Sequence, residues 1–464
     1  MNATGLLFDV DDLVVARPRQ AVPRPVVTAS DETVTPVAGV ALWGPLLDRL
    51  GLVDEADRRG LRPMLGHGAH SGGVCYRALV ETLLAGGDFL ADRALLAGEA
   101  TQALRGEHAL PSHTTLWRFC AGADLGRAAK AAAVNRVMVR RAWAAGAAPP
   151  PGRLTIDPDA TVVETYGPGK QGSRFAYTYQ VGLHPLVGVC GETGEVLAVR
   201  ARGGNANPGR ALSSFIDECA AAIPTGARDR YQLWVRVDSA GYQAEVVEAA
   251  ERHQATFSIT AKQYPNVNAA IHALASDPAT VWQDAAGAEG ERGLQVAETG
   301  FTFAGRQVRL LVRRQPTQAG EQLSLDDLDG FRFQAIITNA TPALSAVQVE
   351  HHHRLRGGIP EDAIRQLKED FGFAHAPLAS FFGNWLWWQA SALAYNTARW
   401  LRALALPAAF ARCRGKRLRL GFLNVAARVT RSGRRLGLRL HKGYAHTSAF
   451  TAAVACVHAL PAFG

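Results

Sequence analysis

The last fifth of the chain lacks acidic residues. Asp370 is the final one, and residues 371–464 contain 13 Lys and Arg. The whole chain carries a net charge of +9, which leaves −4 for residues 1–370. Basic charge gathered at one end predicts a polyanionic partner and binding that weakens with salt, because phosphate contacts release counterions. A solvated basic face on an otherwise neutral fold is the alternative interpretation.

Cysteine is also scarce, and no two cysteines have the C-x-x-C spacing typical of zinc sites. They form no dense framework either, so we expect a reducing, cytoplasmic setting without disulfides. The N-terminus has no basic start followed by an apolar run, and we expect no signal peptide. Residues 371–398 contain no charged side chain, but Pro377, Gly383 and Asn384 interrupt them. This composition predicts a loop and a buried helix, not a membrane span.

Changes in composition divide the chain into seven segments. Apolar residues recur at helical spacing before Gly146-Ala-Ala-Pro-Pro-Pro-Gly152, which is a linker. The helices are short and broken, as at Pro111-Ser112, so a helix-turn-helix DNA reader and a plain helical bundle both fit them. The predicted segments are 1–37, weakly ordered; 38–145, helical and DNA-binding; 146–152, the linker; 153–262, the first part of an α/β core; 263–338, a β-rich insertion; 339–405, the second part of the core with an acidic helix; and 406–464, a basic helical C-terminal region.

The residue pattern from 153 to 262 is typical of an α/β fold. Runs of β-branched and aromatic residues predict strands, and two helices separate the later ones. The strands are expected at 154–157, 176–189, 195–201, 231–238 and 256–260, and the helices at 210–222 and 240–253. This order matches the ribonuclease H fold, in which three antiparallel strands come first and later strands join in parallel through crossover helices. We therefore predict a ribonuclease H-like core with a mixed five-stranded sheet and flanking helices.

Aspartates end two of the predicted strands. Asp157 and Asp159 close the first strand, and Asp238 closes the fourth. The first and fourth strands are neighbours in a ribonuclease H sheet, so these carboxylates would converge. Carboxylates close together repel unless a cation lies between them, and Mg²⁺ prefers such oxygen ligands. Two ions about 4 Å apart would activate an attacking oxygen and stabilise a leaving one. The alternative is that each aspartate only caps the next turn or helix.

A third carboxylate is predicted on a helix. Pro360 is suited to open a helix, with Glu361 and Asp362 in its first turn. Glu361, Arg365 and Lys368 then lie at i, i+4 and i+7 on one face. A metal-binding carboxylate beside two cations is suited to gripping a phosphodiester. A surface ion pair between positions i and i+4 is the alternative interpretation.

Three motifs, in this order, resemble those of the DDE transposases of bacterial insertion sequences, most closely the family numbered thirteen-eighty. The first, similar to D-x-D-[AS]-T, is Asp157-Pro-Asp159-Ala-Thr161. The second, similar to D-S-x-x-[FY], is Asp238-Ser-Ala-Gly-Tyr242. The third, similar to Y-x2-R-x3-E-x6-K, reads His353-x2-Arg356-x4-Glu361-x6-Lys368. Here a histidine replaces the tyrosine, and Pro360 adds one residue before the glutamate. The resemblance runs from about Leu154 to Leu460.

This resemblance implies a DNA transposase that works by cut-and-paste. Asp159, Asp238 and Glu361 would be its catalytic residues and would bind Mg²⁺ or Mn²⁺, as two ions. Asp157 is the alternative first ligand. The implied partner is double-stranded DNA, as terminal inverted repeats and as target, bound by a homodimer on paired ends. We expect no membrane partner and a place in the bacterial cytoplasm, on the nucleoid.

Further side chains are expected to support this site. His353 and Tyr242 would assist the motif residues. Two other functions stay open: a domesticated or inactive transposase that only binds DNA, and a nuclease of the same fold without strand transfer. The side chains expected to bind DNA phosphates are Arg356, Arg365 and Lys368 and, in the basic C-terminal region, Arg414, Lys416, Arg417 and Arg419.

Overall fold

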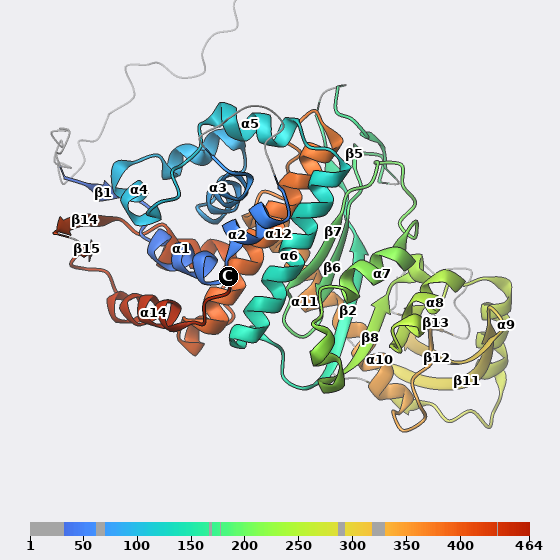
Figure 1. The fold of residues 1–464 in the computed structure, drawn as a ribbon. Helices are drawn as coiled ribbons and strands as arrows, with labels where there is room; N and C mark the ends of the chain where they lie inside the picture. The colour runs from blue at the N-terminus through green and yellow to red at the C-terminus, as the bar shows by residue number, and fades with distance from the viewer. Residues whose placement is uncertain are drawn as a thin grey trace, which may run out of the picture.

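One large mixed sheet runs through the computed structural model of the chain, with helices on both faces (Figure 1). The predicted weakly ordered segment 1–37 lies mostly outside the described residues, which are 32–61, 70–166, 169–176, 178–285, 293–317, 330–433 and 435–464. In their order across the sheet, the strands are β10 (Gln283–Asp284), β11 (Gln295–Phe303), β12 (Arg306–Pro316), β13 (Phe331–Thr338), β9 (Thr256–Thr260), β8 (Tyr231–Val237), β2 (Gly152–Ala160), β6 (Leu186–Cys190) and β7 (Val196–Arg200).

The central strands run in the predicted directions. β8 is parallel to β2 and to β9, whereas β6 is antiparallel to both β2 and β7. The first and fourth predicted strands, β2 and β8, are therefore neighbours. The prediction of one strand over 176–189 is wrong, because Pro185 lacks the N–H that a continuous ladder needs. A separate small sheet forms before it from β3 (Val163–Glu164), β5 (Val181–Leu183) and β4 (Arg174–Phe175).

The β-rich insertion extends the large sheet. β13 pairs antiparallel with β9, and β12 and β11 continue outward from it. Without this pairing, β9 would be an edge strand with unpaired backbone groups. The paired residues Leu310 and Ile337 are fully buried. The prediction of a five-stranded sheet is therefore wrong, because the insertion raises the sheet to nine strands within the described residues.

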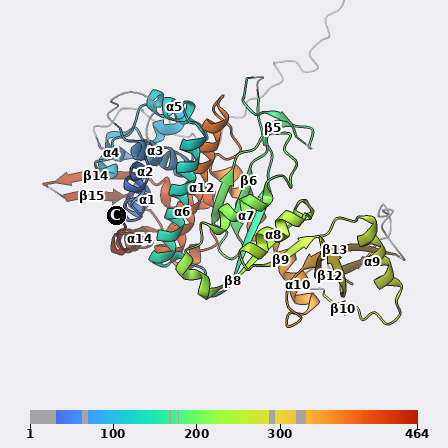
Figure 2. The same ribbon diagram turned by 45° about the vertical axis from the view of Figure 1, so that its right-hand side comes forward.

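Helices flank the sheet on both faces, which confirms the predicted α/β class (Figure 2). α7 packs on β2, β6 and β7 and contacts α8, whereas α10 and α11 lie on the opposite face. The helices of this part are α7 (Leu212–Ala220), α8 (Ala244–Arg252), α9 (Pro265–Ser276), α10 (Ala346–Arg354), α11 (Ile359–Asp370), α12 (Phe381–Leu404) and the short α13 (Gly415–Leu418).

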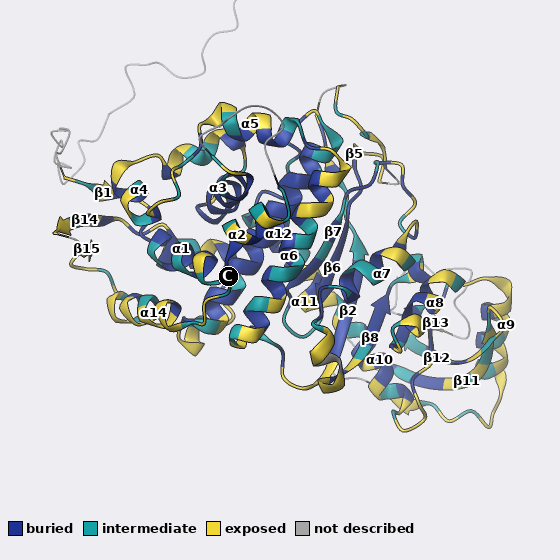
Figure 3. Cartoon of the chain, in the orientation of Figure 1, coloured by how far each residue is buried: buried dark blue, intermediate teal, exposed yellow. Residues whose placement is uncertain are grey.

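A bundle of shorter helices packs against α12. Its central helix, α3, is buried almost throughout (Figure 3). Ser112 Oγ accepts the N–H of Thr115 at 3.1 Å and caps α5, as its place after Pro111 predicts. A helix-turn-helix role for these helices stays a prediction. The helices are α1 (Val40–Arg49), α2 (Leu52–Arg58), α3 (Gly72–Leu84), α4 (Glu99–Arg105), α5 (His113–Ala121) and α6 (Leu125–Ala142).

Residues 371–398 form the loop and buried helix that their composition predicts. α12 begins after Ser380, whose Oγ accepts the N–H of Gly383 at 3.2 Å. α12 lies between the helical bundle and β7, so both sides of this helix are buried. This position explains why the segment carries no charge. Across the described ranges, no helix combines the length and the apolar character needed to cross a membrane.

The C-terminal region is not purely helical, which corrects the prediction for 406–464. It contains a β-hairpin, in which apolar and basic residues alternate with the period of a strand, followed by a helix. Gly433 lies between the two strands with φ near 57°, a turn conformation that favours glycine. The elements are β14 (Ala427–Ser432), β15 (Arg435–Leu440) and α14 (Thr447–Ala459), with β1 (Val34–Thr35) paired to β14.

Candidate active site

The two motif aspartates stand at the same level of the sheet. β2 and β8 pair in parallel as far as Ile156 opposite Val235. Asp159 and Asp238 each follow three residues after this last pair. Both therefore lie at the carboxyl edge of neighbouring strands, where the sequence predicted that they would meet.

Pro158 does not disturb the strand between the two acidic residues of the first motif. It pairs with Gly188 of β6, where an added Cβ would lie 2.2 Å from Sγ of Cys219 in α7. Side chains at this position of the β2–β6 ladder point toward α7, and successive side chains along a strand point to opposite faces. Asp157 and Asp159 therefore both face away from α7, toward the side that α11 covers. The β2–β8 ladder ends before Pro158, which has no N–H to donate to it.

Asp157 is engaged by a buried arginine. Arg236 of β8 donates from Nε to Oδ1 at 2.6 Å and from Nη2 to Oδ2 at 2.7 Å, and it also donates to the backbone oxygen of His352. The Asp157 and Arg236 side chains are only 1% and 2% exposed. Burial raises the pKa of Asp157, and the Arg236 guanidinium opposes that rise. Both carboxylate oxygens of Asp157 are thus committed to an internal ion pair.

Arg236 was not predicted as a site residue, although the sequence carries a signal for it. Arg236 precedes Asp238 by two residues, so their side chains leave the same face of the sheet. The rest of β8, from Tyr231 to Val237, is mostly apolar. A charged residue within such a strand indicates a buried partner, because arginine is almost never fully buried unless it is paired.

Asp159 is surrounded by charges of both signs. Its Oδ1 accepts the N–H of Ala160 at 2.8 Å, and its Oδ2 lies 3.2 Å from Nη2 of Arg356. Burial raises the pKa of Asp159, Arg356 lowers it, and the negative charges of Asp238 and Glu361 raise it further. The other two predicted catalytic carboxylates, Asp238 and Glu361, therefore both act electrostatically on Asp159.

Asp238 has the capping role that the sequence left open as an alternative. Its Oδ1 accepts the N–H of Ala240 at 2.9 Å, at the start of the short helix η5 (Ser239–Gly241). This hydrogen bond engages one carboxylate oxygen and fixes the side chain at the strand end. The charge of Asp238 still acts on Asp159.

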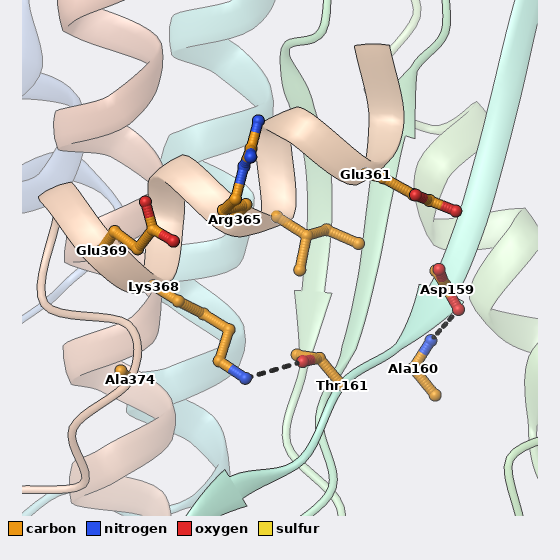
Figure 4. Close-up of a pocket in the computed structure, with 9 residues that line it drawn as sticks. Asp159, Ala160, Thr161, Glu361, Arg365, Lys368, Glu369 and Ala374 are labelled. Carbon is orange, nitrogen blue, oxygen red and sulfur yellow. Dashed lines mark hydrogen bonds between the residues drawn. The ribbon is translucent and has the colours of Figure 1, made fainter. Parts of the chain in front are cut away.

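Glu361 approaches Asp159 from α11. It stands in the first turn of this helix, directly after Pro360. Figure 4 shows the Glu361 carboxylate directed toward Asp159, whereas the Arg365 side chain is directed away from Asp159. The additional residue at Pro360 therefore leaves the glutamate facing the strand ends.

Asp362 is held in other interactions. It forms ion pairs with Arg365 and with Arg414, the second at 2.9 Å, and it accepts a hydrogen bond from Gln366 at 2.6 Å. Burial alone would raise the pKa of Asp362, but the hydrogen bonds from Arg365 and Gln366 hold this pKa below its usual value. Asp362 is therefore tied to the basic residues that follow it.

Lys368 lies beside a pocket of about 510 Å³ that Asp159 and Glu361 also line. Its Nζ donates to the backbone oxygen of Val162 at 2.9 Å and to Oγ1 of Thr161 at 3.3 Å. Burial lowers the pKa of Lys368. A second pocket of about 620 Å³ also includes Lys368 in its lining. The two pockets thus meet at a cation near the carboxylates.

The two predicted supporting residues are packed within the fold. His353 lies 3.0 Å from Ser258 Oγ through Nδ1 and 2.9 Å from Thr260 Oγ1 through Nε2, which joins α10 to β9. Burial lowers the pKa of His353 to about 3, so the ring is neutral at pH 7. The buried Tyr242 ring packs 4.4 Å from that of Phe303. The structure places neither side chain in the carboxylate pocket.

The carboxylates of Asp159, Asp238 and Glu361 are suited to a hard divalent cation. The ion pair between Arg356 and Asp159 must open before a cation can bind there. Within the described residues, no three His, Cys, Asp or Glu side chains lie close enough to hold an ion together. Arg356 contacts the Asp159 oxygen that faces it. Carboxylate oxygens are the ligands that Mg²⁺ prefers, and burial together with repulsion from Asp238 and Glu361 raises the pKa of Asp159. A cation that replaced Arg356 would relieve this repulsion.

The predicted phosphate-binding residues of the C-terminal region fall into two groups. Arg414, Lys416 and Arg417 are exposed on and next to α13. Arg419 is turned inward: it donates to the backbone oxygens of Leu84 at 3.1 Å and Leu83 at 3.2 Å. Its guanidinium also lies 4.8 Å from the centre of the Phe371 ring. Arg419 therefore joins the C-terminal region to the helical bundle.

The sequence of this chain matches a known protein family, and its fold matches a solved structure. No curated protein sequence matches the chain. A chain in the cryo-EM structure of the piggyBac transposase synaptic complex with hairpin DNA matches with a TM-score of 0.39 and 10% identity, over 77% of this chain and 74% of that chain. The family described as transposase DDE domain group 1 matches residues 25–462, which is most of the chain. With the motif acids at one edge of its sheet, this chain belongs to the DDE transposase family.

Proposed function

We propose that this transposase cleaves and rejoins DNA with Asp159, Asp238 and Glu361, moving an insertion sequence by cut-and-paste. The observation that carries the proposal is the arrangement of these carboxylates. Asp159 and Asp238 stand level on neighbouring parallel strands, and Glu361 is directed toward Asp159 from the first turn of α11 (Figure 4). Membership of the DDE transposase family supports the same three roles.

A ribonuclease H-like catalytic core is part of this proposal. The order β7-β6-β2-β8-β9 and the directions of these strands support it. The core then consists of residues 153–262 and 339–405, interrupted by the insertion at 263–338 and joined by the linker at 146–152 to a DNA-binding bundle at 38–145. The basic region at 406–464 contributes a further DNA surface.

The proposed cofactor is Mg²⁺ or Mn²⁺, as two ions held by Asp159, Asp238 and Glu361. When bound, the ions would activate the attacking oxygen and stabilise the leaving oxygen of a phosphodiester. Arg356, which now neutralises Asp159, would transfer to a DNA phosphate. Lys368 is fixed at the strand end by Val162, so its charge would hold the phosphate backbone along the two pockets.

Asp157 is assigned a positioning role. Its bidentate contact with Arg236 orients the face of β2 and β8 from which Asp159 and Asp238 also project. The partner is proposed to be double-stranded DNA, as terminal inverted repeats and as target, held by a homodimer on paired ends. DNA as the substrate supports a location in the bacterial cytoplasm, on the nucleoid.

The experiment that tests this function uses two plasmids. One carries the gene with its natural flanking sequence, and the other is an unrelated target. With Mg²⁺, the protein should release a segment with 3′-OH ends and join those ends to the target, which sequencing of the junctions would detect. Breaks without joined products would indicate a nuclease that lacks strand transfer. Binding without breaks would indicate a DNA-binding descendant of a transposase.

A substitution series on the basic C-terminal region separates DNA binding from folding. Replacing Arg414, Lys416 and Arg417 with Ala should flatten the salt dependence of binding to duplex DNA, by about 0.9 in logarithmic slope for each lost phosphate contact.

Arg419→Ala should instead lower the free energy of unfolding by about 2 kcal/mol, because it removes charged hydrogen bonds to two backbone oxygens.

Arg417→Ala is the matched control for the stability measurement, since its side chain is exposed and should change the free energy of unfolding by less than about 0.5 kcal/mol. Urea unfolding and fluorescence anisotropy at several salt concentrations give the two readouts. An unchanged salt slope in the triple variant would show that these exposed residues do not contact DNA phosphates.

A further inference from the structure

The hairpin of β14 and β15 has two chemically distinct faces. Because side chains alternate along each strand, paired residues share a face. One face is mostly apolar, and the other is polar and basic. The apolar face carries Ala427, Val429, Arg431, Leu436, Leu438 and Leu440, and the basic face carries Arg428, Thr430, Ser432, Arg435, Gly437 and Arg439.

The apolar face attaches the hairpin to the rest of the molecule. Ala427 and Val429 are buried, and the N–H of Val429 donates to the backbone oxygen of Thr33 at 2.8 Å. Leu438 and Leu440 line a cavity of about 440 Å³ bordered by α1, α4 and α14. The pairing of β14 with β1 holds the opposite edge. The basic face is therefore presented to solvent in a fixed orientation.

Three exposed arginines occupy the basic face. Arg428 and Arg439 are paired across the two strands, and Arg435 lies four residues before Arg439 on the same face of β15, near the turn. Glu32 forms an ion pair with Arg428 at 3.0 Å. No acidic residue occurs in the sequence of the hairpin itself.

The centre of the basic face carries only small side chains. Gly437 pairs with Thr430, and an added Cβ on Gly437 would lie 2.6 Å from Thr430 Oγ1. Glycine within a strand often marks a site where another backbone or a ligand approaches closely. The arginines thus stand around a shallow centre made of small side chains.

The dimensions and charge of this ribbon fit the major groove of duplex DNA. Two strands lie about 4.8 Å apart, and six residues span about 20 Å. The major groove is about 12 Å wide and admits a two-stranded β-ribbon. Arginine presents a planar fork that matches O6 and N7 of guanine, and lysine lacks this geometry.

We propose that the β14–β15 ribbon enters the major groove of duplex DNA and reads bases with Arg428, Arg435 and Arg439. This site rests on the proposed function, in which duplex DNA is the substrate. Figures 1 and 2 both show the ribbon at the edge of the molecule, across α1 and α12 from the sheet that carries the carboxylates. Base contacts at the ribbon set the position of the DNA along the protein, and this position determines which phosphate reaches the distant catalytic carboxylates.

The test uses the full chain and a pool of short duplexes with a randomised core. The wild-type protein should enrich a sequence that contains guanines, and 7-deazaguanine at those positions should weaken binding because it lacks N7. Arg435→Lys with Arg439→Lys keeps the charge. This double variant should lose roughly tenfold or more of the preference for the enriched duplex over an unselected one, while affinity for the unselected duplex stays the same.

Arg431→Lys is the matched control, because Arg431 lies on the same hairpin but on its other face. It should keep the wild-type preference. Arg435→Gln with Arg439→Gln should in addition weaken binding to both duplexes, and circular dichroism melting should show that these exposed substitutions leave the fold intact.

Three results would overturn this proposal. A pool without enrichment, or a double Lys variant that keeps the full preference, would show that the ribbon does not read bases. Unchanged affinity in the double Gln variant would show that the ribbon does not bind DNA and would indicate a protein partner. The plasmid assay distinguishes these failures from failure of the proposed function, because a wild-type protein that cuts and joins DNA retains that function whatever the ribbon binds.

Discussion

Asp159→Asn and Asp238→Asn should each reduce strand cleavage by at least about 100-fold and leave binding to duplex DNA intact. Each substitution removes one negatively charged ligand but keeps the shape of the side chain, so stabilisation of the transition state is lost while the phosphate-binding cations remain. Glu361→Gln should have the same effect from the helix side. The plasmid cleavage assay gives the rates, and fluorescence anisotropy gives the affinities.

Asp362→Asn is the control that the chain offers for Glu361→Gln. The two acids are adjacent in the first turn of α11, but Asp362 is bound to Arg365 and Arg414. We expect Asp362→Asn to cut DNA at the wild-type rate. A fast Glu361→Gln variant beside a slow Asp362→Asn variant would transfer the third catalytic role to Asp362.

Arg236→Met should lower the free energy of unfolding by about 3–5 kcal/mol, which is a large part of the stability of most domains. The reason is that Asp157 would be left as a buried carboxylate without its partner, at 1% exposure. Burial already raises the pKa of Asp157 with the arginine present, so this carboxyl group would tend to take up a proton. Urea unfolding monitored by tryptophan fluorescence measures the change.

The double variant with Asp157→Leu and Arg236→Met separates loss of charge balance from loss of packing. It should be more stable than Arg236→Met alone, because apolar replacement of both partners leaves no unpaired charge. Arg252→Met is the exposed control: Arg252 pairs with Asp217 at 50% and 41% exposure, and such pairs contribute about 0–1 kcal/mol. A double variant as unstable as the single one would show that burial of charge is not the cause.

The sequence predicted the central topology because that topology has local signals. The β-branched and aromatic runs before Asp159 and before Asp238, with helices between the later strands, predicted the order of the elements. The match of that order to the ribonuclease H fold predicted that β2 and β8 are neighbours. It could not predict that β13 would pair with β9, since this contact joins Ile337 to Ile259 across a long insertion and has no local signature. The hairpin at Ala427–Leu440 was missed for another reason. Its alternation is visible in the sequence, but the whole region 406–464 was predicted to be helical.

The surroundings of the candidate site residues were predictable to different degrees. The place of Glu361 in the first turn of a helix follows from Pro360 and the charge pattern, whereas the ion pair of Asp157 depends on Arg236, a residue 79 positions away. The inward position of Arg419 likewise depends on the backbone oxygens of another helix, Leu83 and Leu84. Contacts between distant segments decide which charged residues are structural and which are free to bind a substrate.

Anomalous diffraction from crystals soaked in Mn²⁺ would show whether Asp159 and Asp238 hold the metal. We expect a manganese peak in contact with the carboxylates of Asp159 and Asp238, with Arg356 released from Asp159. The peak should be absent from crystals of Asp159→Asn, although that variant keeps the same fold. Manganese bound elsewhere in a protein that cleaves DNA, with the Arg356–Asp159 pair intact, would contradict the assignment of these carboxylates as the catalytic metal site.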